Sequence, residues 1–395
     1  MVNAQMARRM LLLVAAGEVL GMSLWFSATA AAPSVVREFA LDAGTAAWLT
    51  MAVQAGFVAG TLITAVSNLA DAINARRLFA AGCILGAASN FAITLATSAA
   101  ALVALRFCTG AALAWVYPPG MKIAAGWFKE RRGTALGIVV GAVGVGSSIP
   151  HLLGWVGAGL PWRTLVGASS AFALIGATIV AVGVSDGPYV SASAPFDRHA
   201  LKIVVRNRGA RLAMLGYFGH MWELYAMWTW IAAFTAAALG SARTGSAIAF
   251  ITIASGSVGC VMAGFWADRW GKARIAGAAM VASAACSLLS PLAYGASLVL
   301  LLGLAIVWGF TVVADSAQFS ALVTEHTPRT HVGTALTLQT SAGFLLTMVS
   351  IKLVPIVAVG GWKWAFLFLA PGPLLGALAM WRLAAADRSP VTVGG

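Results

Sequence analysis

The segment GFWADRWGKAR (residues 264–274) decides the fold, because a related segment, SNLADAINARR (residues 67–77), occurs in the first half of the chain. Asp71 and Asp268 lie 197 residues apart in a chain of 395, and an arginine follows each of them six residues later. A second pair of matching segments, GTAL at 133–136 and 333–336, has nearly the same separation. Such repeats indicate two similar halves related by duplication.

The composition indicates a membrane protein. Hydrophobic residues make up 60% of the chain and charged residues only 9%, whereas a soluble protein carries about 25% charged residues. A bilayer core requires about 20 mostly apolar residues per helix. Twelve such spans are predicted, near residues 10–32, 45–67, 78–97, 99–124, 133–157, 162–184, 212–238, 244–266, 275–295, 297–322, 332–357 and 362–384. We therefore predict an all-α membrane protein with 12 transmembrane helices in two six-helix bundles, residues 1–184 and 212–395, joined by a cytoplasmic linker at 185–211.

The distribution of positive charge predicts the orientation. Of the 25 Lys and Arg residues, 18 fall on the side of the N-terminus and three lie within or beside spans. The remaining four face the other side: Arg37, Arg163, Arg243 and Lys363. Because basic loops stay in the cytoplasm, both termini are predicted to be cytoplasmic and the protein to lie in the cell (inner) membrane. The net charge of +13 then reflects topology, and no nucleic-acid partner is expected.

Motifs of soluble enzymes and metal proteins are missing from the sequence. The four cysteines lie in apolar stretches without metal-ligand spacing, so neither a disulfide framework nor a metal site is expected. No H-E-x-x-H, C-x-x-C or G-x-G-x-x-G pattern occurs. We therefore expect a protein that is not an enzyme and uses no cofactor.

The repeated loop carries a family resemblance. Gly264, Asp268, Arg269, Gly271 and Lys272 match the loop motif of the major facilitator superfamily of secondary transporters, and the resemblance covers essentially the whole chain. The first copy departs from that motif, with Ser67 and Asn74 in place of its glycines, and RFCTG (106–110) resembles the family's Arg-x-x-x-Gly motif. The resemblance implies a cytoplasmic gate that clamps the two halves together in one conformation. Its residues would be Asp71, Arg76, Arg77, Gly264, Asp268, Arg269, Gly271 and Lys272.

Six ionisable side chains interrupt the apolar spans: Glu18, Arg106, His220, Glu223, Asp315 and Lys352. Each costs about 3 kcal/mol or more in hydrocarbon unless it faces a cavity or a partner. The resemblance implies that helices 1, 4, 7 and 10 line a central cavity, and all but Lys352 lie on those helices. Structural ion pairs between helices are the alternative interpretation.

These positions suggest roles in transport. Burial raises the pKa of a carboxyl group and a nearby cation lowers it, so proton coupling is assigned to Glu18, Glu223, Asp315 and His220. Substrate binding is assigned to Arg106, Tyr117, Trp25, Trp230, Trp308, Gln318 and Lys352. On the seventh span, Trp222 and Tyr225 are expected to face lipid or neighbouring helices, and His151 is expected at the surface.

The predicted function is secondary active transport by alternating access. The substrate would be a small organic or inorganic anion moved with protons, because Arg106, Lys352 and His220 lie near the expected cavity and no nucleotide motif occurs. A drug/proton antiporter is the first alternative, supported by Glu18, the deep tryptophans and the glycine-rich segment 137–150. A non-transporting membrane sensor is the second, although it would need a soluble effector domain. The expected partners are a small-molecule substrate, protons and the lipid bilayer, and the protein is expected to be monomeric.

Overall fold

The computed structural model of this protein describes residues 4–129, 132–189, 197 and 200–387, and in these residues the regular secondary structure is all helical. Each predicted span corresponds to one long helix or to consecutive helical segments, and this confirms the predicted all-α membrane fold with its 12 helices. In the first half the elements are α1 (Ala4–Met22), α2 (Ser27–Ala30), α3 (Ala32–Phe39), α4 (Ala43–Val66), α5 (Leu69–Ala72), α6 (Ala75–Ala92), η1 (Ile93–Leu95), α7 (Ala99–Leu113), α8 (Tyr117–Trp127), α9 (Arg132–Val156) and α10 (Trp162–Gly183).

The second half repeats this order after a linker that contains the short helix α11 (Ala200–Arg206). Its elements are α12 (Arg208–Leu239), α13 (Ala242–Trp270), α14 (Lys272–Ala293), α15 (Leu298–Ala314), α16 (Ser316–His326), η2 (Arg329–His331), α17 (Val332–Val357), η3 (Ala358–Gly360), η4 (Trp362–Trp364), η5 (Leu367–Leu369) and α18 (Pro371–Ala386). We call α1–α10 the N-half and α12–α18 the C-half.

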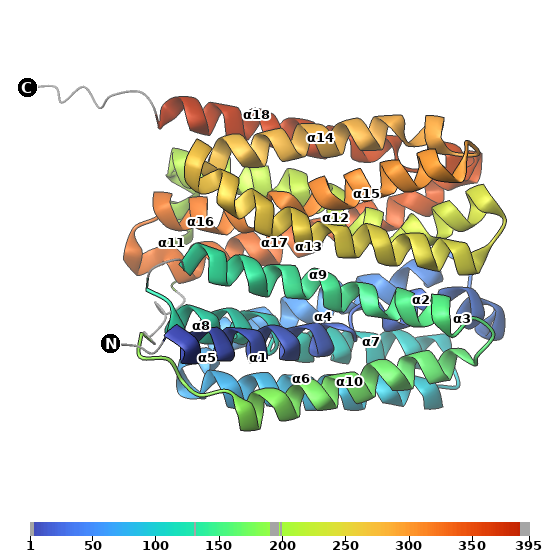
Figure 1. The fold of residues 1–395 in the computed structure, drawn as a ribbon, viewed down its shortest axis with the longest axis horizontal. Helices are drawn as coiled ribbons and strands as arrows, with labels where there is room; N and C mark the ends of the chain where they lie inside the picture. The colour runs from blue at the N-terminus through green and yellow to red at the C-terminus, as the bar shows by residue number, and fades with distance from the viewer. Residues whose placement is uncertain (1–3, 130–131, 190–196, 198–199, 388–395) are drawn as a thin grey trace, which may run out of the picture.

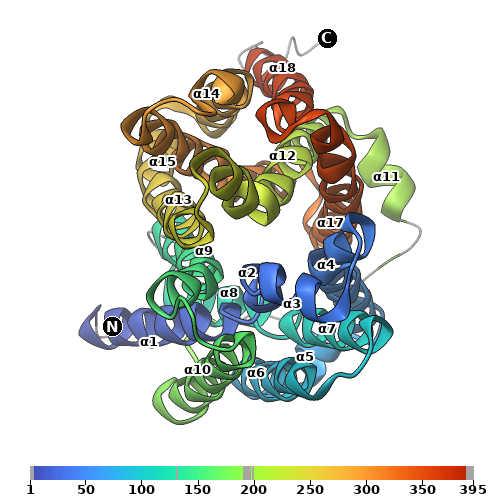
Figure 2. The same ribbon diagram turned by 90° about the vertical axis from the view of Figure 1, so that its right-hand side faces the viewer.

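Figure 2 shows the two halves facing each other, viewed along the helices. The closest packing between the halves joins α9 to α13 and α4 to α17. Across the first of these contacts, the Ser257 hydroxyl donates a hydrogen bond to the Gly141 carbonyl oxygen at 2.7 Å. Helix α1 begins and α18 ends at the same end of the molecule, which we call the terminus end (Figure 1). Helices α2 and α3 lie at the opposite end, which we call the far end.

Ten helical segments of the described chain are long and apolar enough to cross a membrane. The segments around α1 and α12 are not among them, and their sequences explain why. Helix α1 has 19 residues, and these include Arg8, Arg9 and Glu18. Helix α12 contains His220 and Glu223 among several tryptophans and tyrosines. The two spans with the weakest hydrophobic signal are therefore spans that carry buried ionisable groups.

Three spans are interrupted near their middle. The first span breaks between α1 and α2, at residues 23–26. The fourth breaks before α8, where Pro118 and Pro119 occupy the first turn and cannot continue the preceding helix. The tenth breaks at Asp315, between α15 and α16. The fourth and tenth spans are each the fourth span of their half, so both copies of the duplicated unit have a break at this place.

A charged contact at the far end ties α3 to α10. The Glu38 carboxylate accepts hydrogen bonds from Arg163 at 2.6 and 2.9 Å and from the Trp162 indole at 2.7 Å. The Arg163 guanidinium, followed by the Trp162 indole, lowers the pKa of Glu38 from 4.5 to about 2. A carboxyl group with a lowered pKa stabilises the fold above its unfolded pKa, and that stabilisation is lost as the pH falls towards the folded value.

We therefore expect acid to weaken this contact. The melting temperature of the wild-type protein should fall between pH 4.5 and pH 3 more than that of the Glu38→Gln variant, because in the wild type the unfolded chain takes up a proton at Glu38 there while the folded protein does not. The neighbouring variant Arg37→Ala should keep the wild-type acid dependence, since the hydrogen bond of Arg37, to Ser34 at 3.3 Å, involves no acidic group. An identical acid dependence in Glu38→Gln and the wild type would contradict this expectation.

Candidate functional site

A cluster of aromatic rings joins the two halves at the middle of the interface. Trp25, in the break after α1, lies 5.1 Å from Phe57 of α4 and 5.6 Å from Tyr225 of α12, measured between ring centroids. Phe344 of α17 lies 4.7 Å from Phe57 and 5.2 Å from Tyr225. Phe57 and Trp25 belong to the N-half, and Tyr225 and Phe344 to the C-half. Any motion that separates the halves must therefore open this cluster.

The same cluster continues along Phe26, which follows Trp25 in the helix break. The centroid of the Phe26 ring lies 6.2 Å from that of His151 of α9 and 6.1 Å from that of Trp228 of α12. The ring also stacks with Tyr225 at 6.3 Å. We define the interface cluster as Trp25, Phe26, Phe57, His151, Tyr225, Trp228 and Phe344.

One sequence-based expectation about this cluster was wrong. His151 was expected at the surface, but it is fully buried, because α9 packs against α1 on one side and against α13 on the other. Tyr225 was expected to face lipid or neighbouring helices, and it is buried against Trp25 of the N-half and Phe344 of α17. Of the predicted substrate-binding residues, Trp25 is in the cluster. Two cluster residues that were not predicted, Tyr225 and Trp228, could have been found from their spacing, since they lie three residues apart on one face of α12.

Glu18 is buried inside the N-half. It is fully excluded from solvent, and neither carboxylate oxygen has a hydrogen-bond partner among the described residues. The side chain lies against α8, where a Cβ added at Gly120 would come so close to its Oε2 atom that the carboxylate would have to shift. An ionised carboxylate without a partner is very unfavourable in such surroundings.

The structure brings His220 and Asp315 together inside the C-half. His220 Nδ1 lies 2.8 Å from Asp315 Oδ1, and both side chains are buried. His220 also packs its ring against Phe319 at 5.5 Å. Asp315 occupies the break between α15 and α16, so the interruption of the tenth span brings a carboxylate to a histidine of α12.

Glu223 lies one turn along α12 from this pair and is held by different partners. The Trp308 indole donates a hydrogen bond to Oε1 at 2.8 Å, and the Ser283 hydroxyl donates one to Oε2 at 2.7 Å. All three side chains are buried in the C-half. Trp308, predicted to bind substrate, here fixes the orientation of a carboxylate.

Arg106 of α7 lies inside the N-half and is fully buried. Its guanidinium donates to the carbonyl oxygens of Leu49 at 2.9 Å, Leu24 at 3.0 Å and Trp25. It also donates to Ser27 Oγ and Asn90 Oδ1, both at 3.2 Å. Two of these acceptors, the carbonyls of Leu24 and Trp25, belong to the break between α1 and α2. The arginine therefore stabilises the interrupted first span.

The other predicted substrate residues lie apart from the interface cluster. Trp230 donates its indole N–H to the Ile351 carbonyl at 2.9 Å, and the exposed Lys352 follows Ile351 on α17. Tyr117 begins α8 and is half-buried, and Gln318 is buried in α16. The predicted convergence of the charged groups on one chamber stays a prediction. The hydrogen bonds and ion pairs of Arg106, His220, Glu223 and Asp315 given above each stay within one half.

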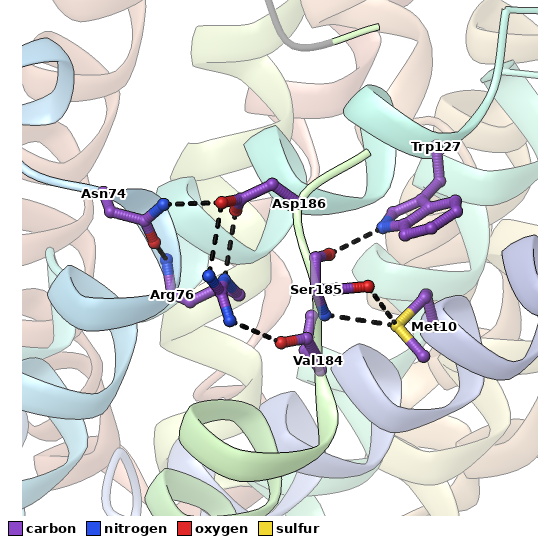
Figure 3. Close-up of polar contacts among 7 residues, drawn as sticks. All are labelled: Met10, Asn74, Arg76, Trp127, Val184, Ser185 and Asp186. Carbon is purple, nitrogen blue, oxygen red and sulfur yellow. Dashed lines mark hydrogen bonds and ion pairs between the residues drawn. The ribbon is translucent and has the colours of Figure 1, made fainter. Parts of the chain in front are cut away.

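One predicted gate residue of the N-half, Arg76, lies in a polar network at the terminus end (Figure 3). Arg76 pairs with Asp186 at 3.1 Å and donates to the Val184 carbonyl at 2.7 Å. Asn74 donates to the same carboxylate at 2.8 Å. Asp71 of α5 pairs with Lys122 of α8 at 2.6 Å, and Arg77 is exposed. These contacts fasten α5 and the start of α6 to α8 and to the segment after α10.

The C-half has its own ion pairs at the terminus end. Lys272 at the start of α14 pairs with Glu325 of α16 at 2.6 Å, and His326 lies 3.1 Å from Asp387 after α18. Gly271 adopts a φ of +92°, a conformation that favours glycine, at the turn between α13 and α14. Asp268 and Arg269 are exposed, and a side chain added at Gly264 would meet open space. In this conformation the ion pairs of both loops lie within their own half.

Comparison with known proteins identifies the family. The model of the Major Facilitator Superfamily matches residues 13–259 and 213–394, which together span nearly the whole chain. The chain is also 29% identical over 136 residues to the 3-(3-hydroxy-phenyl)propionate transporter of Escherichia coli (strain K12). That match covers 34% of this chain and 33% of that protein, so it spans about a third of the relative's length. With the family match extending through both halves, this chain belongs to the Major Facilitator Superfamily, and it is a multi-pass membrane protein.

Proposed function

We propose that this protein is a proton-coupled secondary transporter that moves a small anion by alternating access. The observation that carries the proposal is the interface cluster, which closes the contact between two similar halves with side chains from both of them. The two moving bundles would be residues 1–184 and 212–395, and the terminus end would face the cytoplasm. We further propose that the protein is monomeric, lies in the inner membrane and is not an enzyme.

Proton coupling is supported by the three buried acids. Glu18 has no partner for its carboxylate among the described residues, so its neutral, protonated form is the stable one in this conformation. A conformation that admits water to α8 would let it ionise. Asp315 beside His220 and Glu223 beside Trp308 can likewise change protonation when their partners move. The proposed coupling groups are therefore Glu18, His220, Glu223 and Asp315.

An organic anion is favoured by the relative whose printed substrate, 3-(3-hydroxy-phenyl)propionate, is a carboxylic acid. The drug/proton antiporter is retained as the second candidate, because the interface cluster also suits an aromatic, amphipathic substrate. Arg106 is assigned a structural role in this proposal, since its guanidinium is engaged by five protein acceptors.

The gate proposal is kept in modified form. Ion pairs that stay within each half leave Asp268 and Arg269 exposed at the terminus end. We propose that these residues engage the opposite half when the terminus end closes. Gly264, with open space beside it here, would then provide the close approach.

Proteoliposomes with a pH electrode test the function. Adding 3-phenylpropionate outside should cause an alkaline drift of the external medium, because protons enter with the anion, and Glu18→Gln should reduce that drift to the level of protein-free liposomes. The matched control is Glu325→Gln, an acid of the terminus-end network with an exposed side chain. An acid drift on adding a cationic drug, with no response to the anion, would favour the antiporter.

A further inference from the structure

The interface cluster contains three polar side chains that are buried without a partner. Trp25 and Trp228 are 1% and 2% exposed and His151 is 0% exposed. Neither indole N–H and neither imidazole nitrogen has a hydrogen-bond partner among the described residues. Buried polar groups are nearly always paired, and a group left unpaired needs an explanation.

These three side chains are neighbours in space. His151 and Trp228 both contact the ring of Phe26, and Trp25 and Trp228 both contact the ring of Tyr225. They come from the break after α1, from α9 and from α12, so donors of both halves meet around the same two rings. Other buried or half-buried tryptophans donate to protein acceptors, as in Trp222, which donates to the Phe368 carbonyl at 3.2 Å.

The chemistry of the cluster selects one kind of ligand. Its side chains supply N–H donors and aromatic faces but no carboxylate, and Glu223 of α12 and Asp315 after α15 are held by other partners. Each indole offers a donor and no acceptor, and the imidazole adds one more N–H donor. Three N–H donors fit the oxygens of an anion, and stacked rings fit a flat apolar body.

We propose that Trp25, His151 and Trp228 form the specificity site for an aromatic carboxylate. Their N–H groups bind the carboxylate oxygens, and Phe26, Phe57, Tyr225 and Phe344 enclose the ring once the two halves separate. This inference rests on the proposed anion transport. It assigns that function to residues of α9 and α12 that neither the family match nor the relative identifies.

Substitutions that remove an N–H and keep a ring test the site. In proteoliposomes, Trp25→Phe and Trp228→Phe should each raise the KM for 3-phenylpropionate about tenfold, because a hydrogen bond to a charged group is lost, with a smaller change in kcat. His151→Leu should abolish the preference for 3-phenylpropionate over the neutral 3-phenylpropionamide. The control Trp222→Phe, on the same helix, should keep the wild-type KM, because its N–H is already bonded within the C-half.

A binding measurement on the wild-type protein keeps the test independent of how the variants fold. 3-Phenylpropionate should raise the melting temperature, whereas 3-phenylpropionamide and benzylamine should not. Unchanged KM values in both tryptophan variants, with anion transport intact, would overturn the site and leave the proposed function standing. Stabilisation by benzylamine alone, without anion transport, would overturn the site and the anion function together.

Discussion

Replacement of Arg106 with alanine is expected to lower the free energy of unfolding by about 3–5 kcal/mol, because several buried acceptors lose a charged donor at once. The acceptors are backbone carbonyls around the break in the first span, together with Ser27 and Asn90. Without the guanidinium, the break should shift, and with it Trp25 and Phe26. Arg106→Lys should lose part of this stability, because an ammonium group cannot reach acceptors on three sides.

The measurement is the melting temperature and the monodispersity of the purified variants in detergent. Arg243→Ala is the matched control, since Arg243 is exposed near the start of α13 and its removal should leave the melting temperature unchanged. If Arg106→Ala melts like the wild type and loses only substrate affinity, then Arg106 binds substrate, as its sequence position suggested, and the structural assignment is wrong.

The second large effect is expected at Asp315. Asp315→Asn should abolish accumulation driven by a pH gradient, reducing it to the level of protein-free liposomes, because an amide of the same size cannot take up or release a proton. Exchange of labelled for unlabelled substrate should persist, since that reaction requires no net proton movement. Asp315 lies 2.8 Å from His220, so the substitution also leaves the His220 imidazole without its acidic partner.

A similar histidine–aspartate contact at the terminus end provides the control. Asp387 lies 3.1 Å from His326, and its side chain is partly exposed, so Asp387→Asn should accumulate substrate like the wild type. Gradient-driven accumulation by Asp315→Asn at the wild-type rate would remove Asp315 from the coupling groups.

Much of the fold could be predicted because hydrocarbon imposes a length and a composition on each span. The eleventh span was predicted at 332–357, and α17 runs from Val332 to Val357. The limits of the first span were less accurate, since α1 begins at Ala4 and the chain continues through α2 and α3 to Phe39. Charged residues at both ends of that span made its hydropathy a poor guide to its limits.

The candidate site was harder to predict, because its partners are distant in sequence. The sequence identified Glu18, Arg106, His220, Glu223 and Asp315 as unusual, and the structure buries all five. What a buried charge contacts depends on how the helices pack. The acceptors of Arg106 are mostly backbone carbonyls, which no residue type reveals. His151 lies near a span end, where histidines are often exposed. Its burial follows from the packing of α9 against its neighbouring helices, which the sequence does not reveal.

The two copies of the repeated loop make different contacts, and this has a consequence for how the halves evolve after the duplication. Asp71 pairs with Lys122, whereas its counterpart Asp268 is exposed and the loop of the C-half is held by Lys272 and Glu325. A substitution that suits one loop therefore need not suit the other, so the two copies can diverge in sequence independently.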